Sequence, residues 1–209
     1  MLRAALERLR WPGRKGREAG RIGDPGALRR ALAEQAVYLA ARSVTEYTRM
    51  RVGRHWPRLF AEDSFQQALE TACRDTRPLV LLWLARTADL ALSGSAAAVV
   101  ADAGRAALGD LDCVPLAGGA PVLAHVRAEL AALGAAPPLP LTDIVRPREA
   151  ALFVDALPLD PMFTEDDADT IRNSLRLLLA GAYETFTRQL NGPALAHAAA
   201  KPASEPVSG

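Results

Sequence analysis

The sequence predicts an all-α protein: a single irregular helical bundle of about six to seven helices, with a flexible basic N-terminal segment and a disordered C-terminal tail. Half of the 209 residues are apolar but only 5% are aromatic, so the interior must consist mostly of Leu, Ala and Val. Such residues suit close helix packing better than a β-sandwich. Apolar residues also recur at spacings of three and four, and no alternating apolar and polar run predicts a strand.

Composition divides the chain into three parts. Residues 1–23 are predicted to be an amphipathic basic segment and linker, residues 24–192 the helical bundle domain, and residues 193–209 a disordered tail rich in Ala, Pro and Ser. In the first part, an apolar helical face is followed by a stretch rich in Gly and Arg. A basic segment with such a face is typical of helices that lie on a membrane surface or dock on a protein.

The first helix of the bundle is predicted from Asp24-Pro25 to Gly53. Asp is a favoured N-cap, Pro suits the first helical position, and Gly is a natural stop. The positions predicted to face the core keep the helical spacing over about six turns. They are Leu28, Leu32, Ala36, Leu39, Ser43, Tyr47 and Met50.

The next segment is predicted to be interrupted. Pro57 admits a new helix after the Gly53 stop, so one broken helix or two short ones span 57–75. A separate helix is then predicted to open at Thr76 and Pro78 and is apolar almost all round as far as Leu92. A helix without a polar face belongs at the centre of a bundle.

Further helices complete the bundle. They are predicted from beyond Gly94-Ser95 to about Leu108, over Pro121–Leu133, over Pro147–Leu157, and from Thr164 to Asn191. In the last helix, Thr164 is the predicted cap, and Glu165, Asp166, Asp167 and Asp169 are assigned to compensation of the helix dipole. Its predicted buried stripe is Ala168, Ile171, Leu175, Leu178, Ala182, Phe186 and Leu190.

The formal net charge of +1 conceals a strong asymmetry. Residues 1–58 hold 14 Lys and Arg against 5 Asp and Glu, a balance of +9, whereas residues 59–209 have a balance of −8. A basic quarter on an acidic body can steer an anionic partner such as an acidic protein, a phospholipid surface or a nucleic acid.

Known catalytic and metal-binding motifs are missing. The sequence has no HExxH, no GxSxG, no phosphate loop and no dinucleotide fingerprint, so no catalytic residue, metal ligand or cofactor is predicted. His125 and Glu129 share a helical face and are interpreted as a surface or half-buried pair. Cys73 and Cys113 lack CxxC partners and are interpreted as small buried hydrophobic residues.

Two groups of residues are the candidates for binding. The first lies at the predicted helix break, where arginine and aromatic residues alternate: Tyr47, Arg49, Arg54, His55, Trp56 and Arg58. The second is the N-terminal segment, with candidates Leu2, Leu6, Leu9, Trp11, Arg14 and Lys15.

Three functions follow from these observations, in order of preference. The first is a non-catalytic adaptor that docks a protein partner or an anionic membrane surface through its basic quarter. The second is a small-molecule or enzymatic site near residues 47–60, with Tyr47 and His55 as polar anchors and Trp56 and Trp83 as apolar walls. The third is nucleic-acid binding, ranked last because no reading motif is present.

The expected location is cytoplasmic, with contact at the inner face of the membrane left open. No apolar signal region precedes the bundle, and the best apolar run, residues 79–85, is too short to cross a bilayer. A protein partner is expected, and self-association stays open.

Overall fold

The computed structural model describes residues 22–111, 120–160 and 167–200, and within these ranges the protein is all-α, as predicted. Two 3-10 turns, η2 (Gly53–His55) and η3 (Leu141–Asp143), separate some of the helices. No strand occurs in the described ranges, where only an isolated bridge joins two residues. The α-helices are α2 (Pro25–Val52), α3 (Trp56–Leu59), α4 (Asp63–Ala91), α5 (Ala97–Asp110), α6 (Ala120–Ala131), α7 (Pro147–Asp155), α8 (Ala168–Gln189) and α9 (Gly192–Ala200).

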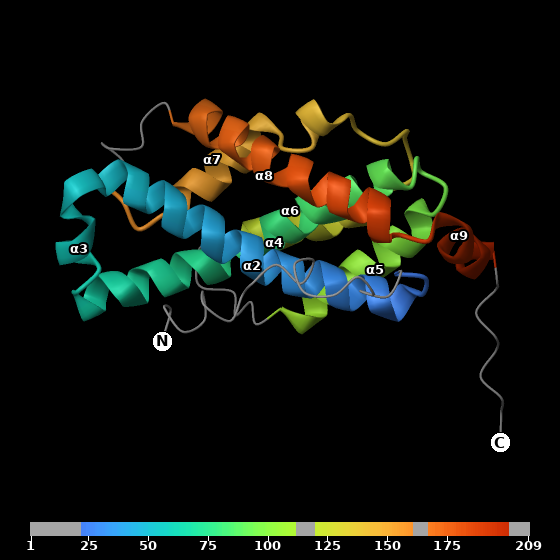
Figure 1. Ribbon diagram of the computed structural model, residues 1–209, viewed down its shortest axis with the longest axis horizontal. Helices are drawn as coiled ribbons and strands as arrows, with labels where there is room; N and C mark the ends of the chain where they lie inside the picture. The colour runs from blue at the N-terminus through green and yellow to red at the C-terminus, as the bar shows by residue number, and fades with distance from the viewer. Residues whose placement is uncertain (1–21, 112–119, 161–166, 201–209) are drawn as a thin grey trace, which may run out of the picture.

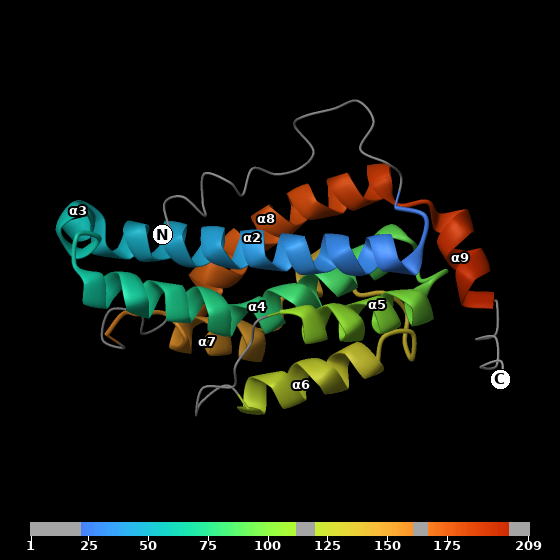
Figure 2. The same cartoon turned by 90° about the horizontal axis from the view of Figure 1, so that it is seen from below.

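The helix α4 is the centre of the bundle, as its apolar sequence predicts. It packs against α2, α5, α6, α7 and α8, and every side chain from Leu79 to Ala85 is buried. Figures 1 and 2 show α2 and α4 antiparallel along the long axis, with α3 at one end and α9 at the other. In Figure 2, α6 lies on the side of α4 and α5 that faces away from α8.

Local signals set the ends of α2 as predicted. The Asp24 side chain accepts a hydrogen bond from the backbone N–H of Ala27 at 2.8 Å, which satisfies one free donor of the first turn. The predicted core positions from Leu28 to Tyr47 are buried. Met50 is 57% exposed, so its assignment to the core is wrong. It lies at a shallow groove between α2 and α8, near the end where α2 leaves the bundle.

A single helix occupies the segment predicted to hold a break near Pro78. α4 runs through this residue without interruption, so the separate helix predicted to open at Thr76 and Pro78 is wrong. Proline lacks an N–H, and the carbonyl of Arg74 therefore has no normal helical donor. Core packing holds the helix together here, because Thr76, Pro78 and the residues that follow it are buried. The hydroxyl of Thr76 also donates to the carbonyl of Ala72 at 2.9 Å in the turn before the proline.

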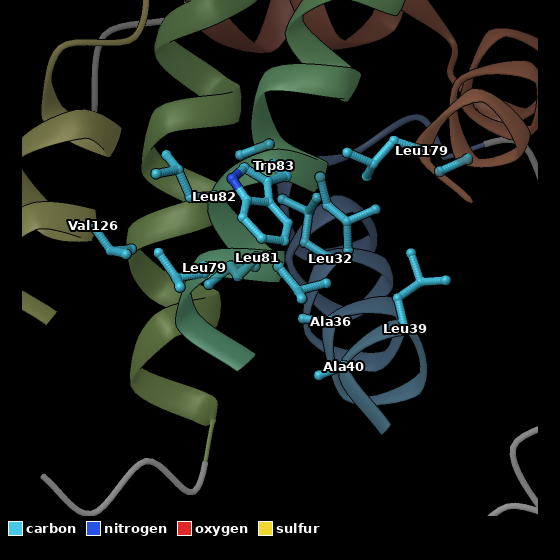
Figure 3. Packing of buried hydrophobic residues seen from close by; sticks show 14 of the residues in the cluster. Leu32, Ala36, Leu39, Ala40, Leu79, Leu81, Leu82, Trp83, Val126 and Leu179 are labelled. Carbon is cyan, nitrogen blue, oxygen red and sulfur yellow. The ribbon is translucent and has the colours of Figure 1, made fainter. Parts of the chain in front are cut away.

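The core forms where α2 and α4 face each other. Figure 3 shows Leu32 of α2 close to Leu81 and Trp83 of α4, with Val126 of α6 and Leu179 of α8 on either side. Trp83 has no exposed surface and is the largest of the fully buried side chains. Burying one such large apolar side chain contributes roughly 1.5–3 kcal/mol, so this cluster is a main source of stability.

Of the stripe predicted for α8, Ile171, Leu175, Ala182 and Phe186 are buried, whereas Ala168 and Leu190 at the two ends are half-buried. Leu179 is buried, whereas the predicted Leu178 is only half-buried, because a step of four residues from Leu175 points most directly at α4. The helix begins at Ala168, and Thr164, Glu165 and Asp166 lie outside the described residues.

The predicted disordered tail is wrong for residues 193–200, which lie in α9. This segment is rich in Ala, the best helix former, and Leu195 is buried where α9 packs against α5. Residues 201–209 lie outside the described part of the chain. Among the described helices, none combines the length and apolar character that crossing a membrane requires.

The beginning of the described chain is fixed to the junction between α8 and α9. The N–H of Ile22 donates to the carbonyl of Gln189 at 2.8 Å, and its own carbonyl accepts from the N–H of Asn191 at 2.9 Å. Ile22 is also buried, so the last residues of the segment predicted as linker belong to the bundle.

Candidate functional site

The predicted binding residues of the helix break lie at one end of the bundle, around α3 (Figure 1). α2 ends here because Gly53 adopts a φ of 53°, a conformation that costs glycine little. Its N–H donates to the carbonyl of Arg49, and Pro57 in the first turn of α3 starts the next short helix. The chain thus reverses direction over a few residues.

A pocket of about 360 Å³ opens at this end of the molecule. Three of its lining side chains are apolar, namely Val52, Leu59 and Leu159. The others are polar: Arg51, His55, Arg58 and Glu62. The pocket therefore combines an apolar wall with two arginines, a histidine and a single carboxylate.

Trp56 is used for packing and does not line this pocket. Its ring stacks on Phe60 with centroids 4.9 Å apart and meets the edge of the Phe65 ring at 6.1 Å. Aromatic pairs in these arrangements stabilise a fold beyond the area they bury. Trp83, the second aromatic wall suggested by the sequence, lies in the core and not at this corner.

Tyr47 and Arg51 both bind the carboxylate of Asp167. The buried Tyr47 hydroxyl donates to Asp167, and the Arg51 side chain forms an ion pair with it, with Nε 2.5 Å from Oδ2. The Arg51 guanidinium also lies over the Tyr47 ring, 5.9 Å from its centroid. Asp167 stands at the N-terminus of α8, where its charge can compensate the helix dipole, but its side chain makes no cap hydrogen bond and binds residues of α2 instead.

Replacing Asp167 with alanine is expected to lower the free energy of unfolding by about 1.5–3 kcal/mol, because a buried hydroxyl and a guanidinium lose their shared acceptor. Urea denaturation followed by circular dichroism measures the loss. Asp169→Ala is the matched control, since that side chain is 84% exposed and pairs only with Arg172. The control is expected to change stability by less than about 0.5 kcal/mol. Equal losses in the two variants would contradict the role assigned to Asp167.

The other basic residues of the corner are not used in folding. Arg49, Arg54, His55 and Arg58 are exposed. Within the described residues, none of these four side chains forms an ion pair or a hydrogen bond. No described residue neutralises the charges of these side chains, which leaves them as candidates for contact with a ligand or a partner.

A second polar cluster lies inside the bundle, around Arg86 of α4. Its Nη1 donates to the carbonyl of Ile144 and to Oε2 of Glu149, both at 2.8 Å, and its Nη2 donates to Glu129 at 2.6 Å. The Trp83 indole N–H donates to Glu149 at 2.8 Å. Arg86 and Glu149 are both buried, so each charge depends on the other.

The surroundings of Glu149 decide its charge state. Burial works to raise the pKa of Glu149, but hydrogen bonding and attraction to Arg86, with the indole N–H of Trp83, outweigh burial and hold the pKa below its usual range. Oε1 of the same carboxylate lies 3.1 Å from Nε2 of His125. The cluster is almost fully hydrogen-bonded, which is typical of a structural network.

The structure gives different partners to the pair predicted on α6. His125 contacts Glu149, while Glu129 binds Arg86 and also accepts from Arg146 at 2.8 Å. The interpretation of His125 and Glu129 as a mutual pair is therefore wrong. The partners of both residues come from distant parts of the chain, and the spacing of residues within one helix cannot predict such contacts.

Cys73 is buried, as predicted, and burial raises the pKa of its thiol to about 12. A thiol in this state is a poor nucleophile. Cys113 lies outside the described residues. Within them, no group of three His, Cys, Asp or Glu side chains is placed to hold a metal ion.

The docking candidates of the N-terminal segment, from Leu2 to Lys15, all lie outside the described residues. Sequence reasoning missed Asp167, Arg86 and Glu149 as interacting groups. One signal was available for Arg86: it is a charged residue that directly follows a long apolar run.

Comparison with known proteins gives no relative from which a role could be carried over. No family model, curated protein or solved structure matches this chain.

Proposed function

We propose that the protein is a non-catalytic adaptor that docks an acidic segment of a protein partner on its basic corner, defined as the exposed side chains of Arg49, Arg54, His55 and Arg58. The observation that carries this proposal is that these side chains have no described partner. All four are exposed without an ion pair in the described part of the chain, beside a pocket with an apolar wall.

The charge of the corner favours carboxylates as ligands. Arginine presents a fork of N–H donors that matches a carboxylate, and its charge persists at every physiological pH. Arg51 is already engaged by Asp167 and serves to hold the pocket wall in place. Glu62 is the only acidic side chain among the pocket-lining residues, so the corner keeps a net positive charge. The positive balance of residues 1–58 adds long-range attraction.

The apolar wall favours a protein segment over a nucleic acid. Val52, Leu59 and Leu159 offer a surface for one apolar side chain, which a peptide can carry next to its acidic residues. A nucleic acid brings phosphates and large flat bases, and the only tryptophan of the corner is already stacked on Phe60. His55 forms no hydrogen bond with a described carboxylate, which supports binding rather than proton transfer.

The test uses the full-length protein and fluorescent peptides in which glutamates flank a leucine or an alanine. We expect the leucine peptide to bind more tightly than the alanine peptide, and added salt to weaken both. The double variant Arg54→Glu/Arg58→Glu should lose about tenfold or more in affinity, because two favourable contacts become repulsive. Fluorescence anisotropy measures the dissociation constants.

The matched control reverses two exposed arginines on other helices, Arg127→Glu/Arg148→Glu. This control has the same net charge as the corner variant. Equal weakening in both variants would reduce the effect to overall charge and contradict a defined docking site. Tighter binding of single-stranded DNA than of either peptide would favour the nucleic-acid alternative instead.

A further inference from the structure

A second pocket lies where α4, α6 and the segment 132–139 meet, far along α4 from the basic corner. Its volume is about 230 Å³, and the lining residues include Arg86 and Asp89 of α4, Glu129 of α6, and Arg146. The remaining wall is formed by the segment 132–139, which is mostly apolar and contains two prolines.

The segment 132–139 is held tightly in place. Gly134 has a φ of 86°, and a Cβ at this position would come 2.9 Å from the Cβ of Ala97 on α5. Only glycine combines this backbone conformation with such a close approach. Two consecutive prolines follow at 137 and 138 and restrict the chain further. The pocket wall is thus built from a rigid turn.

Asp89 lines this pocket without a partner of its own. The residue is only 3% exposed, and its Oδ1 is buried with no hydrogen bond. The other buried carboxylates described above, Glu149 and Asp167, each bind an arginine. Burial raises the pKa of Asp89, as expected for a carboxylate without a counter-charge.

Among the described carboxylates of this pocket, Asp89 is the one that no arginine pairs with. Arg86 and Arg146 are matched by Glu129 and Glu149, through the ion pairs already described. His125 contacts Glu149 and is not among the residues that line the pocket. A ligand with one positive charge would therefore find in Asp89 a carboxylate that no described side chain already binds.

We infer that this pocket is a binding site for a small primary ammonium ion, with Asp89 as the group that receives its N–H donors. An ammonium group supplies three donors to a carboxylate that has none in the protein. The described residues provide no set of three His, Cys, Asp or Glu ligands for a metal ion, so an organic cation fits better. The apolar wall suits a short alkyl chain, and the volume lies below the range of about 300–1,000 Å³ that holds larger ligands.

The experiment titrates the full-length, isotope-labelled protein with n-butylammonium chloride and follows backbone amide resonances by NMR. We expect saturable shifts at residues 132–139 and at Asp89. Butan-1-ol, a neutral molecule of the same shape, should bind much more weakly. Asp89→Asn should reduce the affinity for n-butylammonium at least about tenfold, because it removes the charge and keeps the shape.

Two controls keep this result interpretable. Asp102→Asn changes an exposed carboxylate on α5, whose side chain is 70% exposed, and should leave the affinity unchanged. Asp89→Asn should unfold at the same or a higher temperature than the parent protein, because an unpaired buried charge is lost. Equal affinity of the parent and Asp89→Asn for n-butylammonium, or shifts without saturation, would overturn the inference.

Discussion

Replacing Arg86 with alanine is expected to destabilise the protein by about 3–5 kcal/mol, the loss typical of removing one partner of a buried ion pair. Glu149 has no exposed surface and would be left without its counter-charge. The carbonyl of Ile144 would lose its donor as well. Urea denaturation, followed by circular dichroism, measures the free energy of unfolding of the variant and of the parent protein.

The loss should depend on pH in a defined direction. Because Arg86 holds the pKa of Glu149 below its usual range despite burial, this carboxylate stabilises the intact protein above its unfolded-state pKa. That contribution is lost as the pH falls through the lowered pKa. Without Arg86, burial dominates and raises the pKa. The deficit of Arg86→Ala should therefore shrink towards acid pH, where Glu149 takes up a proton.

A double variant separates lost charge pairing from lost packing. Arg86→Met/Glu149→Leu removes both buried charges and keeps much of the volume, so it should be less destabilised than Arg86→Ala. Arg146 and Glu129 keep their own ion pair in this variant. A double variant as unstable as the single one, or a single variant as stable as the parent, would contradict the structural role of the cluster.

Replacing Trp83 with alanine is expected to cost about 3–5 kcal/mol, because a fully buried aromatic side chain leaves a cavity at the centre of α4. Trp83→Phe keeps most of the packing and removes the indole N–H that Glu149 accepts, so about 1–3 kcal/mol should be lost in that variant. Thermal and urea denaturation of both variants measure the two contributions separately.

Trp56→Ala is the matched control at the other end of the molecule. Trp56 is only half-buried, and its contacts with Phe60 and Phe65 lie outside the centre of the bundle. The control should lose clearly less stability than Trp83→Ala. If the two losses were equal, the core would not be concentrated around α4 as the packing indicates.

The helices could be predicted from the sequence where local chemistry decides the structure. Asp24 and Gly53 set the two ends of α2 through contacts within three or four residues of the chain. The all-round apolar character of residues 79–85 likewise predicted the central position of α4. Pro78 misled the prediction, because the burial of Pro78 and of the residues after it outweighs one missing backbone hydrogen bond.

The polar contacts could not be predicted, because they join residues far apart in the chain. Tyr47 and Asp167 are 120 residues apart, and Arg86 and Glu149 are 63 apart. Dipole compensation at the start of α8 was a sufficient local explanation for Asp167, and it gave no indication of the contacts with Tyr47 and Arg51. The exposed arginines of the basic corner were found from sequence because they stand outside the apolar stripe. No sequence signal marked the unpaired carboxylate of Asp89, because the lack of a partner depends on which side chains the other helices place near it.

The bridge between Ile22 and Leu190 fixes the start of the described chain at one end of the bundle. The chain enters the bundle beside α9, whereas the basic corner lies at the far end of α2 (Figure 1). Since α2 has 28 residues, about 42 Å separates the two ends at 1.5 Å per residue. The start of the described chain and the basic corner therefore lie at opposite ends of the bundle.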